Sequence, residues 1–178
     1  MAPLIRIAEA LEAHSHSAPP TLVATAAANV VLATGFALLL GAAFSLRNRR
    51  GRRAGLLWGV AGYAVFFIAP SIGLPPELPG TESAALHDRQ LWWAGTVIAT
   101  AIGLWVAIFS KKPWLRVVGL ALLVAPHLIG APQPAVHGGT VPFQLARDFI
   151  IATAIANAFL WLSLGGLFGL FYRTEASQ

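Results

Sequence analysis

The sequence predicts an all-α, polytopic membrane protein with five transmembrane helices. Its composition is the first reason: 57% of its 178 residues are hydrophobic and only 11% are charged. A soluble domain carries charge on about a quarter of its residues, so this chain cannot cover itself with a polar surface. Five long uncharged stretches and a one-sided placement of the basic residues are the second and third reasons.

The predicted spans have the length that crosses a bilayer, which is about 20 apolar residues in a helix. All of them must be helical, because lipid offers the backbone no hydrogen-bonding partner. The fourth reaches span length only when it is counted from Trp114. The spans are residues 20–46, 54–74, 90–110, 114–131 and 148–172, and they form a single helical membrane domain of residues 19–178.

Basic residues predict the orientation of these spans. The link at 47–53 (RNRRGRR) holds five arginines, and the link at 111–116 (KKPWLR) holds three basic residues. With Arg173, nine of the twelve basic residues fall on one side, which we assign to the cytoplasm. Six of the seven acidic residues fall on the other side. The N-terminus is therefore predicted outside and the C-terminus inside, and the net charge of +5 indicates topology and not a nucleic-acid partner.

Two parts of the chain resemble each other, which predicts a tandem repeat of an up–down helix pair. Residues 54–76 (AGLLWGVAGYAVFFIAPSIGLPP) and 116–134 (RVVGLALLVAPHLIGAPQP) both follow a basic link and reach Ala-Pro, then glycine, then proline. Residues 89–105 (RQLWWAGTVIATAIGLW) and 147–161 (RDFIIATAIANAFLW) both begin with arginine and end on tryptophan. Parallel repeats of this kind are related by an axis along the membrane normal.

Proline breaks the rising helix of each repeat near its outer end. A proline removes a backbone hydrogen bond, and carbonyls freed at membrane depth are tolerated only where protein or water covers them. Two matching breaks on one face predict a shared, outward-facing vestibule, with a simple kink and helix stop as the alternative. Asn29 and Asn157 lie inside spans and are further candidates for lining a pathway.

Histidines and carboxylates gather on the predicted outer side and could hold a divalent cation. All five histidines fall there, and imidazole and carboxylate ligands suit cobalt, nickel and zinc. His127, directly after Pro126, is the strongest candidate because ionisable groups inside a span are usually functional. An interfacial histidine bonded to a freed carbonyl is the alternative. The remaining candidate ligands nearby are Glu77, His87 and Asp88.

These other candidates also have structural interpretations. The prolines around Glu77 suit a placed carboxylate or a rigid turn, and Asp88 could cap a helix. Residues 1–18 are predicted as an outer amphipathic segment with an apolar stripe at helical spacing. Its candidate ligands are Glu9, Glu12 and His16 on another face, with His14 if the chain is extended there, and a solvated polar face is the alternative.

Several classes of protein are disfavoured. The chain has no Walker A motif, no GxGxxG and no GxSxG, and it has no cysteine for a thiolate metal site or a disulfide. Haem would need histidine pairs deep within spans. We therefore expect neither an enzyme nor a permanently bound cofactor.

These motifs together resemble the CbtA family of predicted bacterial cobalt transporter subunits. The resemblance rests on residues 55–80 (GLLWGVAGYAVFFIAPSIGLPPELPG), 89–93 (RQLWW) and 126–134 (PHLIGAPQP), and it covers nearly the whole chain. It implies a multi-pass protein of the bacterial inner membrane, tied to vitamin B12 supply, that acts with CbtB, a small single-span partner with a His-rich end. Family members carry an extra apolar helix before the segment matching residues 2–14, so a sixth, N-terminal helix is expected to be missing here.

The expected function is that of a membrane subunit for uptake of cobalt, with nickel as the alternative ion. The ion would be bound outside by histidine and glutamate and pass inward between kinked helices. A non-transporting scaffold or sensor that docks the small His-rich partner is the alternative function. Membrane lipid is an expected partner, nucleic acid is not, and a homo-oligomer is left open.

Overall fold

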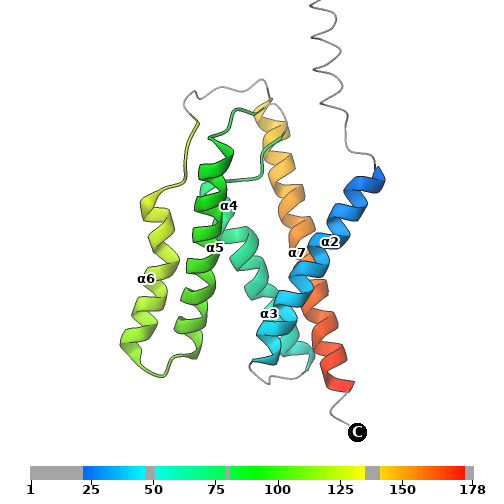
Figure 1. The fold of residues 1–178 in the computed structure, drawn as a ribbon, viewed down its shortest axis with the longest axis vertical. Helices are drawn as coiled ribbons and strands as arrows, with labels where there is room; N and C mark the ends of the chain where they lie inside the picture. The colour runs from blue at the N-terminus through cyan, green and yellow to red at the C-terminus, as the bar shows by residue number, and fades with distance from the viewer. Residues whose placement is uncertain (1–21, 47–50, 79–80, 135–140, 175–178) are drawn as a thin grey trace, which may run out of the picture. The chain divides into compact units, whose positions relative to one another are not determined.

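Helices account for the regular structure of the part of the chain that can be described. The computed structural model describes residues 22–46, 51–78, 81–134 and 141–174. The elements are α2 (Leu22–Ser45), α3 (Arg52–Tyr63), the π-helical turn η1 (Ala64–Ile68), α4 (Ala69–Gly73), α5 (Leu86–Phe109), α6 (Pro113–Ile129) and α7 (Phe143–Thr174), and they are drawn in Figure 1. The predicted all-α fold class is confirmed.

Within the residues that the structure describes, four stretches of helix are long and apolar enough to cross a membrane. They are Val23–Ser45, Arg52–Gly73, Leu86–Phe109 and Phe143–Phe171. The remaining helix, α6, has 17 residues and therefore lies at the lower limit of about 17 for a span. The chain is thus a polytopic membrane protein, as its hydropathy predicts.

Helices α5 and α7 begin four and five residues before the predicted spans. Helix α5 starts at Leu86 and not at residue 90, and α7 starts at Phe143 and not at residue 148. The additional N-terminal turns contain charged residues, and the predicted spans begin where the apolar run starts. A membrane helix can continue beyond the hydrocarbon layer, because its polar side chains then reach the interface and water.

The chain divides into two units, residues 1–39 and residues 40–178. In the first unit the described residues belong to α2, an apolar helix whose side chains are mostly exposed. The second unit contains the end of α2 and all the later helices. The division predicted from the sequence, an outer segment of residues 1–18 before one membrane domain, stays a prediction.

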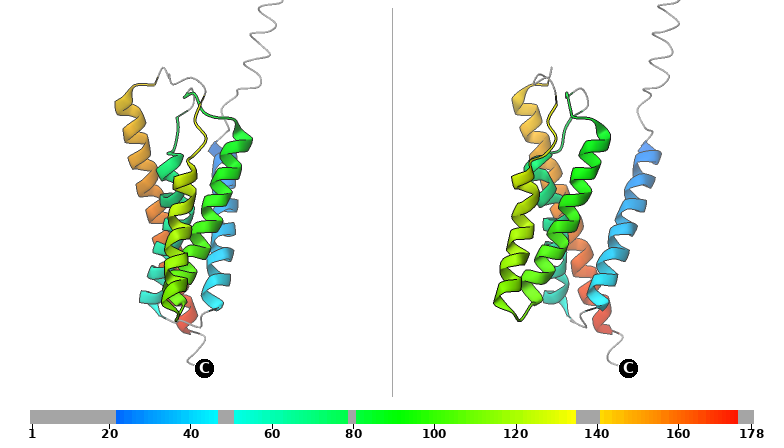
Figure 2. Two further views of the ribbon diagram at one scale, coloured as in Figure 1. Left: turned by 90° about the vertical axis from the view of Figure 1, so that its left-hand side faces the viewer. Right: turned by 60° about the vertical axis from the view of Figure 1, so that its left-hand side comes forward.

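Glycines allow α3 and α7 to pack closely. A Cβ added to Gly55 would meet the carbonyl oxygen of Gly165, and one added to Gly59 would meet the carbonyl oxygen of Trp161. Gly62 lies directly against the Trp161 ring, which is 1% exposed. Figures 1 and 2 show the two helices side by side. The GxxxG pairs in these helices therefore serve backbone approach, as expected of such motifs.

Helices α5 and α6 form the second extensive interface of this unit, also through small residues. A Cβ on Gly119 would meet the backbone of Gly103 and Ala107, and Leu123 covers Gly103 from the same helix as Gly119. The two helices follow each other along the chain and form a hairpin in both views of Figure 2.

Each of the two interfaces joins a helix of one predicted repeat to a helix of the other repeat. Under that repeat α3 corresponds to α6 and α5 to α7. The extensive contacts are α3 with α7 and α5 with α6, so the rising helix of each repeat packs on the descending helix of the other. This exchange is the arrangement expected when parallel repeats face each other across an axis along the membrane normal.

The two proline breaks differ in their backbone. Before Pro70 the helix widens into η1, and the N–H of Ala69 donates to Ala64, five residues back. Pro126 instead lies within α6, which continues to Ile129 and ends at Gly130 with a φ of 86°. The extra residue of a π-turn is a common adjustment next to a missing N–H. The two breaks therefore match in sequence but differ in backbone geometry.

Candidate cation site at the proline-broken helix ends

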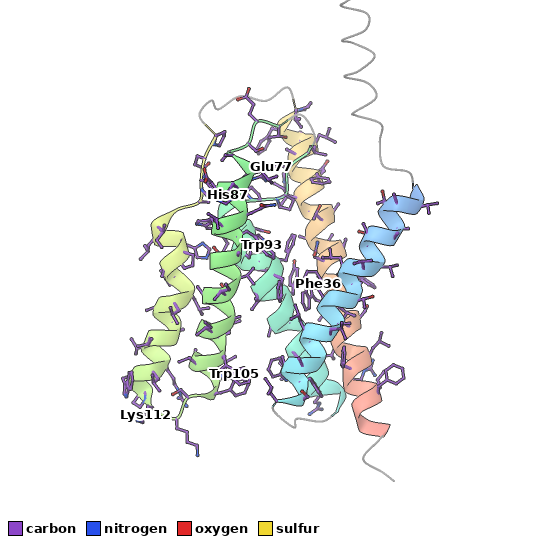
Figure 3. The ribbon with its side chains drawn as sticks, viewed as in Figure 1. Phe36, Glu77, His87, Trp93, Trp105 and Lys112 are labelled. Carbon is purple, nitrogen blue, oxygen red and sulfur yellow. The ribbon has the colours of Figure 1, made fainter. Side chains whose placement is uncertain are left out.

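The proline-broken ends of α4 and α6 lie at the same end of the second unit as the start of α5. Figures 1 and 2 show the ends of α4 and α6 directed toward the same end as the starts of α5 and α7. Glu77 and His87 lie at this end, and Lys112 lies at the other (Figure 3). The alternation of the helices therefore separates the acidic and histidine candidates from a basic link.

Trp92 of α5 connects the two breaks. Its ring lies against Gly73, where a Cβ would meet both the indole and the Ala131 side chain. The His127 ring lies edge-on to it, with ring centroids 6.1 Å apart and an interplanar angle of 66°. Gly73 ends the first broken helix, and His127 and Ala131 belong to the second break. One indole therefore holds both breaks together.

Trp93 has a different environment from its neighbour. It is 39% exposed and lies near Phe66 at a centroid distance of 6.4 Å. The sequence suggests that both tryptophans belong to an interfacial belt, but the half-buried Trp92 faces the bundle. Its position three residues after Arg89, on one helical face with it, is the signal that could have identified this difference.

Glu77 forms an ion pair with Arg89. The Nη2 of Arg89 lies 2.9 Å from Oε2 of Glu77, and the two side chains are 25–27% exposed. Glu77 sits in the proline-rich segment after α4, and Arg89 lies in the first turns of α5. The prolines thus hold the carboxylate against a guanidinium. Arg89 is absent from the predicted ligand set, because a cation does not coordinate a metal.

The ion pair between Glu77 and Arg89 is expected to contribute to thermal stability. Glu77→Gln and Arg89→Gln are each expected to lower the thermal stability of the purified protein, since each leaves one charge without its partner. The double variant is expected to lose little more than either single one, with a coupling of about 0.5–1 kcal/mol. Thermal unfolding in detergent measures it, with Glu82→Gln in the same segment as the control. Additive losses would show that the pair contributes nothing.

His127 lies where the sequence predicts it, inside a helix and one residue after its proline. It is half-buried, and its ring faces Trp92. His87 and Asp88 are both exposed in the first turn of α5. The capping role considered for Asp88 is wrong, since the N-cap is Ala85 and no side chain caps the helix. An acidic residue in a first turn is instead favourable to the helix dipole.

Four candidate ligands lie outside the described residues: Glu9, Glu12, His14 and His16. Within the ranges that the structure describes, no group of three histidine, aspartate or glutamate side chains is placed to hold a metal ion. The described part of the chain thus brings Glu77 and His127 to one end of the helices without assembling a complete coordination shell.

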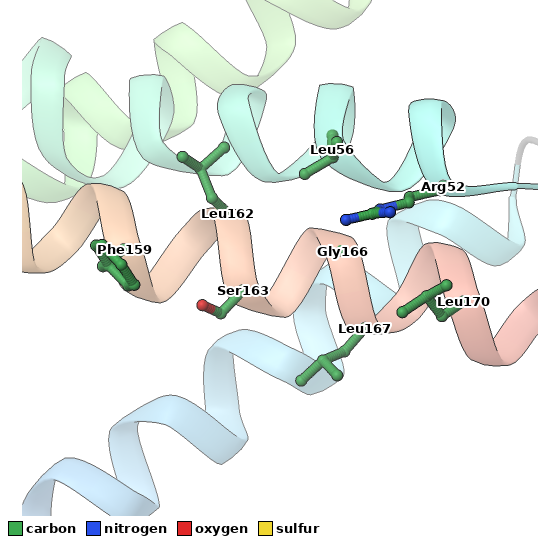
Figure 4. Close-up of a pocket in the computed structure, with 8 residues that line it drawn as sticks. All are labelled: Arg52, Leu56, Phe159, Leu162, Ser163, Gly166, Leu167 and Leu170. Carbon is green, nitrogen blue, oxygen red and sulfur yellow. The ribbon is translucent and has the colours of Figure 1, made fainter.

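A cavity of about 480 Å³ lies along α3 and α7 (Figure 4). Its walls are mainly leucine and phenylalanine side chains, with Ser163 and Gly166. Arg52 is its charged lining residue, and its side chain lies between α3 and α7 in Figure 4. An apolar groove with a guanidinium repels a divalent cation, so this cavity does not suit the ion.

The helices and their broken ends define a polytopic helical membrane protein with the acidic and histidine candidates at one end and a basic link at the other. The family model described as "Probable cobalt transporter subunit (CbtA)" matches residues 3–173, and the chain belongs to this family. Comparison with curated proteins finds no match, and comparison with solved structures finds none either. Family membership makes the protein a membrane-embedded cobalt transporter subunit.

Proposed function

We propose that the protein takes up cobalt by receiving the dication at the proline-broken ends of α4 and α6 and passing it inward between the helices. The observation that carries this proposal is the meeting of both breaks at Trp92, with His127 and Glu77 at the same end. We place this end outside the bacterial inner membrane and the basic links in the cytoplasm. The N-terminus is then outside and the C-terminus inside.

Glu77 and His127 are the proposed principal ligands. A carboxylate oxygen and a neutral imidazole nitrogen suit cobalt, and they suit nickel almost equally. Arg89 holds the carboxylate in place, and a dication must compete with this guanidinium. The exposed His87 and Asp88, with Glu9, Glu12, His14 and His16 of the outer segment, are proposed as weaker sites that first attract the ion.

The membrane potential can drive the inward step. It contributes about 2.3 kcal/mol per charge for each 100 mV, and so about 4.6 kcal/mol for a dication. The sequence shows no recognisable ATP-binding motif, so an ATP-driven step would need another chain. The word "subunit" in the family description supports a partner, and we propose a small single-span protein with a His-rich end.

Reconstitution tests this function. Proteoliposomes holding the purified chain, with an inside-negative potential, are expected to accumulate radioactive cobalt faster than protein-free vesicles. If they do so only when the His-rich partner is included, the transporting unit is the pair. If neither preparation takes up cobalt while the two chains still purify together, the uptake proposal fails in favour of a scaffold or sensor.

A further inference from the structure

We propose that the buried face of α5 lines a hydrated path from the broken helix ends to the middle of the membrane, with the Thr100 hydroxyl at its deep end. The role given to this path, which is to carry the cation, rests on the proposed function. Its existence depends only on the polar groups described below.

Four residues of α5 share one helical face. Arg89, Trp92, Thr96 and Thr100 follow one another at spacings of three, four and four residues, which places them in a row along the helix. The row begins at the ion pair with Glu77 and runs three turns inward. Thr96 and Thr100 are 0% and 4% exposed, so its deep part lies inside the bundle.

Three side chains in this row carry a buried polar atom that has no hydrogen-bond partner. These atoms are the Nε of Arg89, the Nε1 of Trp92 and the Oγ1 of Thr100. Leaving a buried donor or acceptor unpaired costs free energy, and such groups are commonly satisfied by water or an ion. Their concentration on one face of one helix therefore indicates a polar channel and not three separate defects.

The two threonines differ in a way that supports this interpretation. A buried threonine in a helix usually donates to the carbonyl four residues back, and Thr96 does so to Trp92 at 2.8 Å. The hydroxyl of Thr100 makes no such bond, although it is as deeply buried. By comparison, Asn157, a pathway candidate from the sequence, donates to the Thr153 carbonyl of its own helix.

On the wall opposite this face we expect backbone oxygen atoms from the proline break. Both η1 and α4 contact α5, and Val65 and Ala69 are buried residues of these two elements. In an α-helix the N–H of Ala69 would serve the Val65 carbonyl, but here it serves Ala64, and Pro70 has no N–H to offer. Backbone carbonyls released in this way coordinate cations and water in other discontinuous membrane helices.

These groups suit a hydrated cation better than a bare one. A hydroxyl and carbonyls accept hydrogen bonds from water, and the indole and guanidinium N–H groups donate them. Small divalent cations lose their water reluctantly, so a water-lined wall lowers the cost of entering the membrane. The positive Arg89 at the entrance would oppose a cation, and its pairing with Glu77 reduces this opposition.

Cysteine accessibility tests the path directly, because the chain contains no cysteine of its own. Thr100→Cys changes the side-chain size little and introduces the single thiol of the full-length protein. Ile98→Cys and Ile102→Cys are matched controls on the same helix, since these side chains are 59% and 49% exposed and are expected to face lipid. The probe is a small, positively charged, membrane-impermeant methanethiosulfonate reagent added to the outer side of intact cells.

The hydrated path predicts that Thr100→Cys reacts at least about tenfold faster than both controls, because the thiolate, which attacks the reagent and displaces methanesulfinate, forms only in contact with water. Excess cobalt is expected to slow this reaction. Equal rates at the three positions, or no reaction at Thr100→Cys and at Thr96→Cys one turn nearer the entrance, would overturn the path.

The result also separates the path from the proposed function. Labelling at Thr100→Cys in a protein that transports no cobalt would retain the path and reject cobalt uptake. Uptake without labelling would retain the function and reject the path.

In addition, Thr100→Val is expected to reduce uptake without loss of folded protein, whereas Thr100→Ser is expected to retain normal uptake. A purely structural hydroxyl would show the loss in folding instead.

Discussion

Cells that produce the His127→Ala, Glu77→Gln double variant are expected to accumulate no more radioactive cobalt than cells without the protein. The reason is that the two proposed principal ligands are removed together at the entrance. Loss of even an indirect partner of a metal site costs about 10–100-fold in affinity, so loss of two ligands should exceed that. Uptake at a fixed low cobalt concentration, normalised to protein in the membrane, measures it.

The single variants and a matched carboxylate separate coordination from folding. Glu82→Gln changes an exposed carboxylate in the same segment as Glu77 and is expected to leave uptake unchanged. His127→Ala also leaves Trp92 without its edge-on neighbour, so the amount of folded protein must be measured beside the uptake. Normal uptake by a well-folded double variant would exclude both residues as ligands.

Gly59→Leu is expected to prevent formation of the native helix bundle. A Cβ at this position already meets the carbonyl of Trp161, and a leucine side chain has no room between α3 and α7. Overpacking of a well-packed core costs about 1–3 kcal/mol, and more where backbone atoms are the obstacle. The yield of monodisperse protein after detergent extraction and its melting temperature measure the effect.

Gly95→Leu is the control for this substitution. Gly95 also lies in a membrane helix, but a Cβ there meets nothing within 4 Å. The variant is therefore expected to fold normally. A Gly59→Leu protein that is as stable as Gly95→Leu would show that the close approach of α3 and α7 is not required.

The sequence by itself determined the fold class and, for the described residues, the number of helices and much of their extent. Hydropathy is a local property that marks the apolar stretches. A backbone inside lipid must satisfy its own hydrogen bonds, so each of these stretches forms a helix. The glycine pairs at Gly55/Gly59 and Gly165/Gly169 could likewise be identified as close-packing positions. The helix starts at Leu86 and Phe143 could not be identified from the sequence, because the charged residues in the first turns end the hydropathy signal.

For the candidate site, the sequence could predict which residues belong to it but not how they contact one another. His127 and Glu77 can be selected from the sequence because each adjoins a proline in an otherwise apolar chain. The partner of Glu77, which is Arg89, and the position of Trp92 between the two breaks could not be derived. These are contacts between segments that are far apart along the chain.

Tertiary structure alone decided which helices pair and which face of each helix is buried. The repeat in the sequence cannot show that α3 packs on α7 and α5 on α6, since similar apolar surfaces could pair in several ways. The same is true of Thr100, which is one of several threonines until packing buries its hydroxyl without a partner. Composition and periodicity describe each helix separately, whereas shape complementarity between helices selects one arrangement among many of similar hydrophobicity.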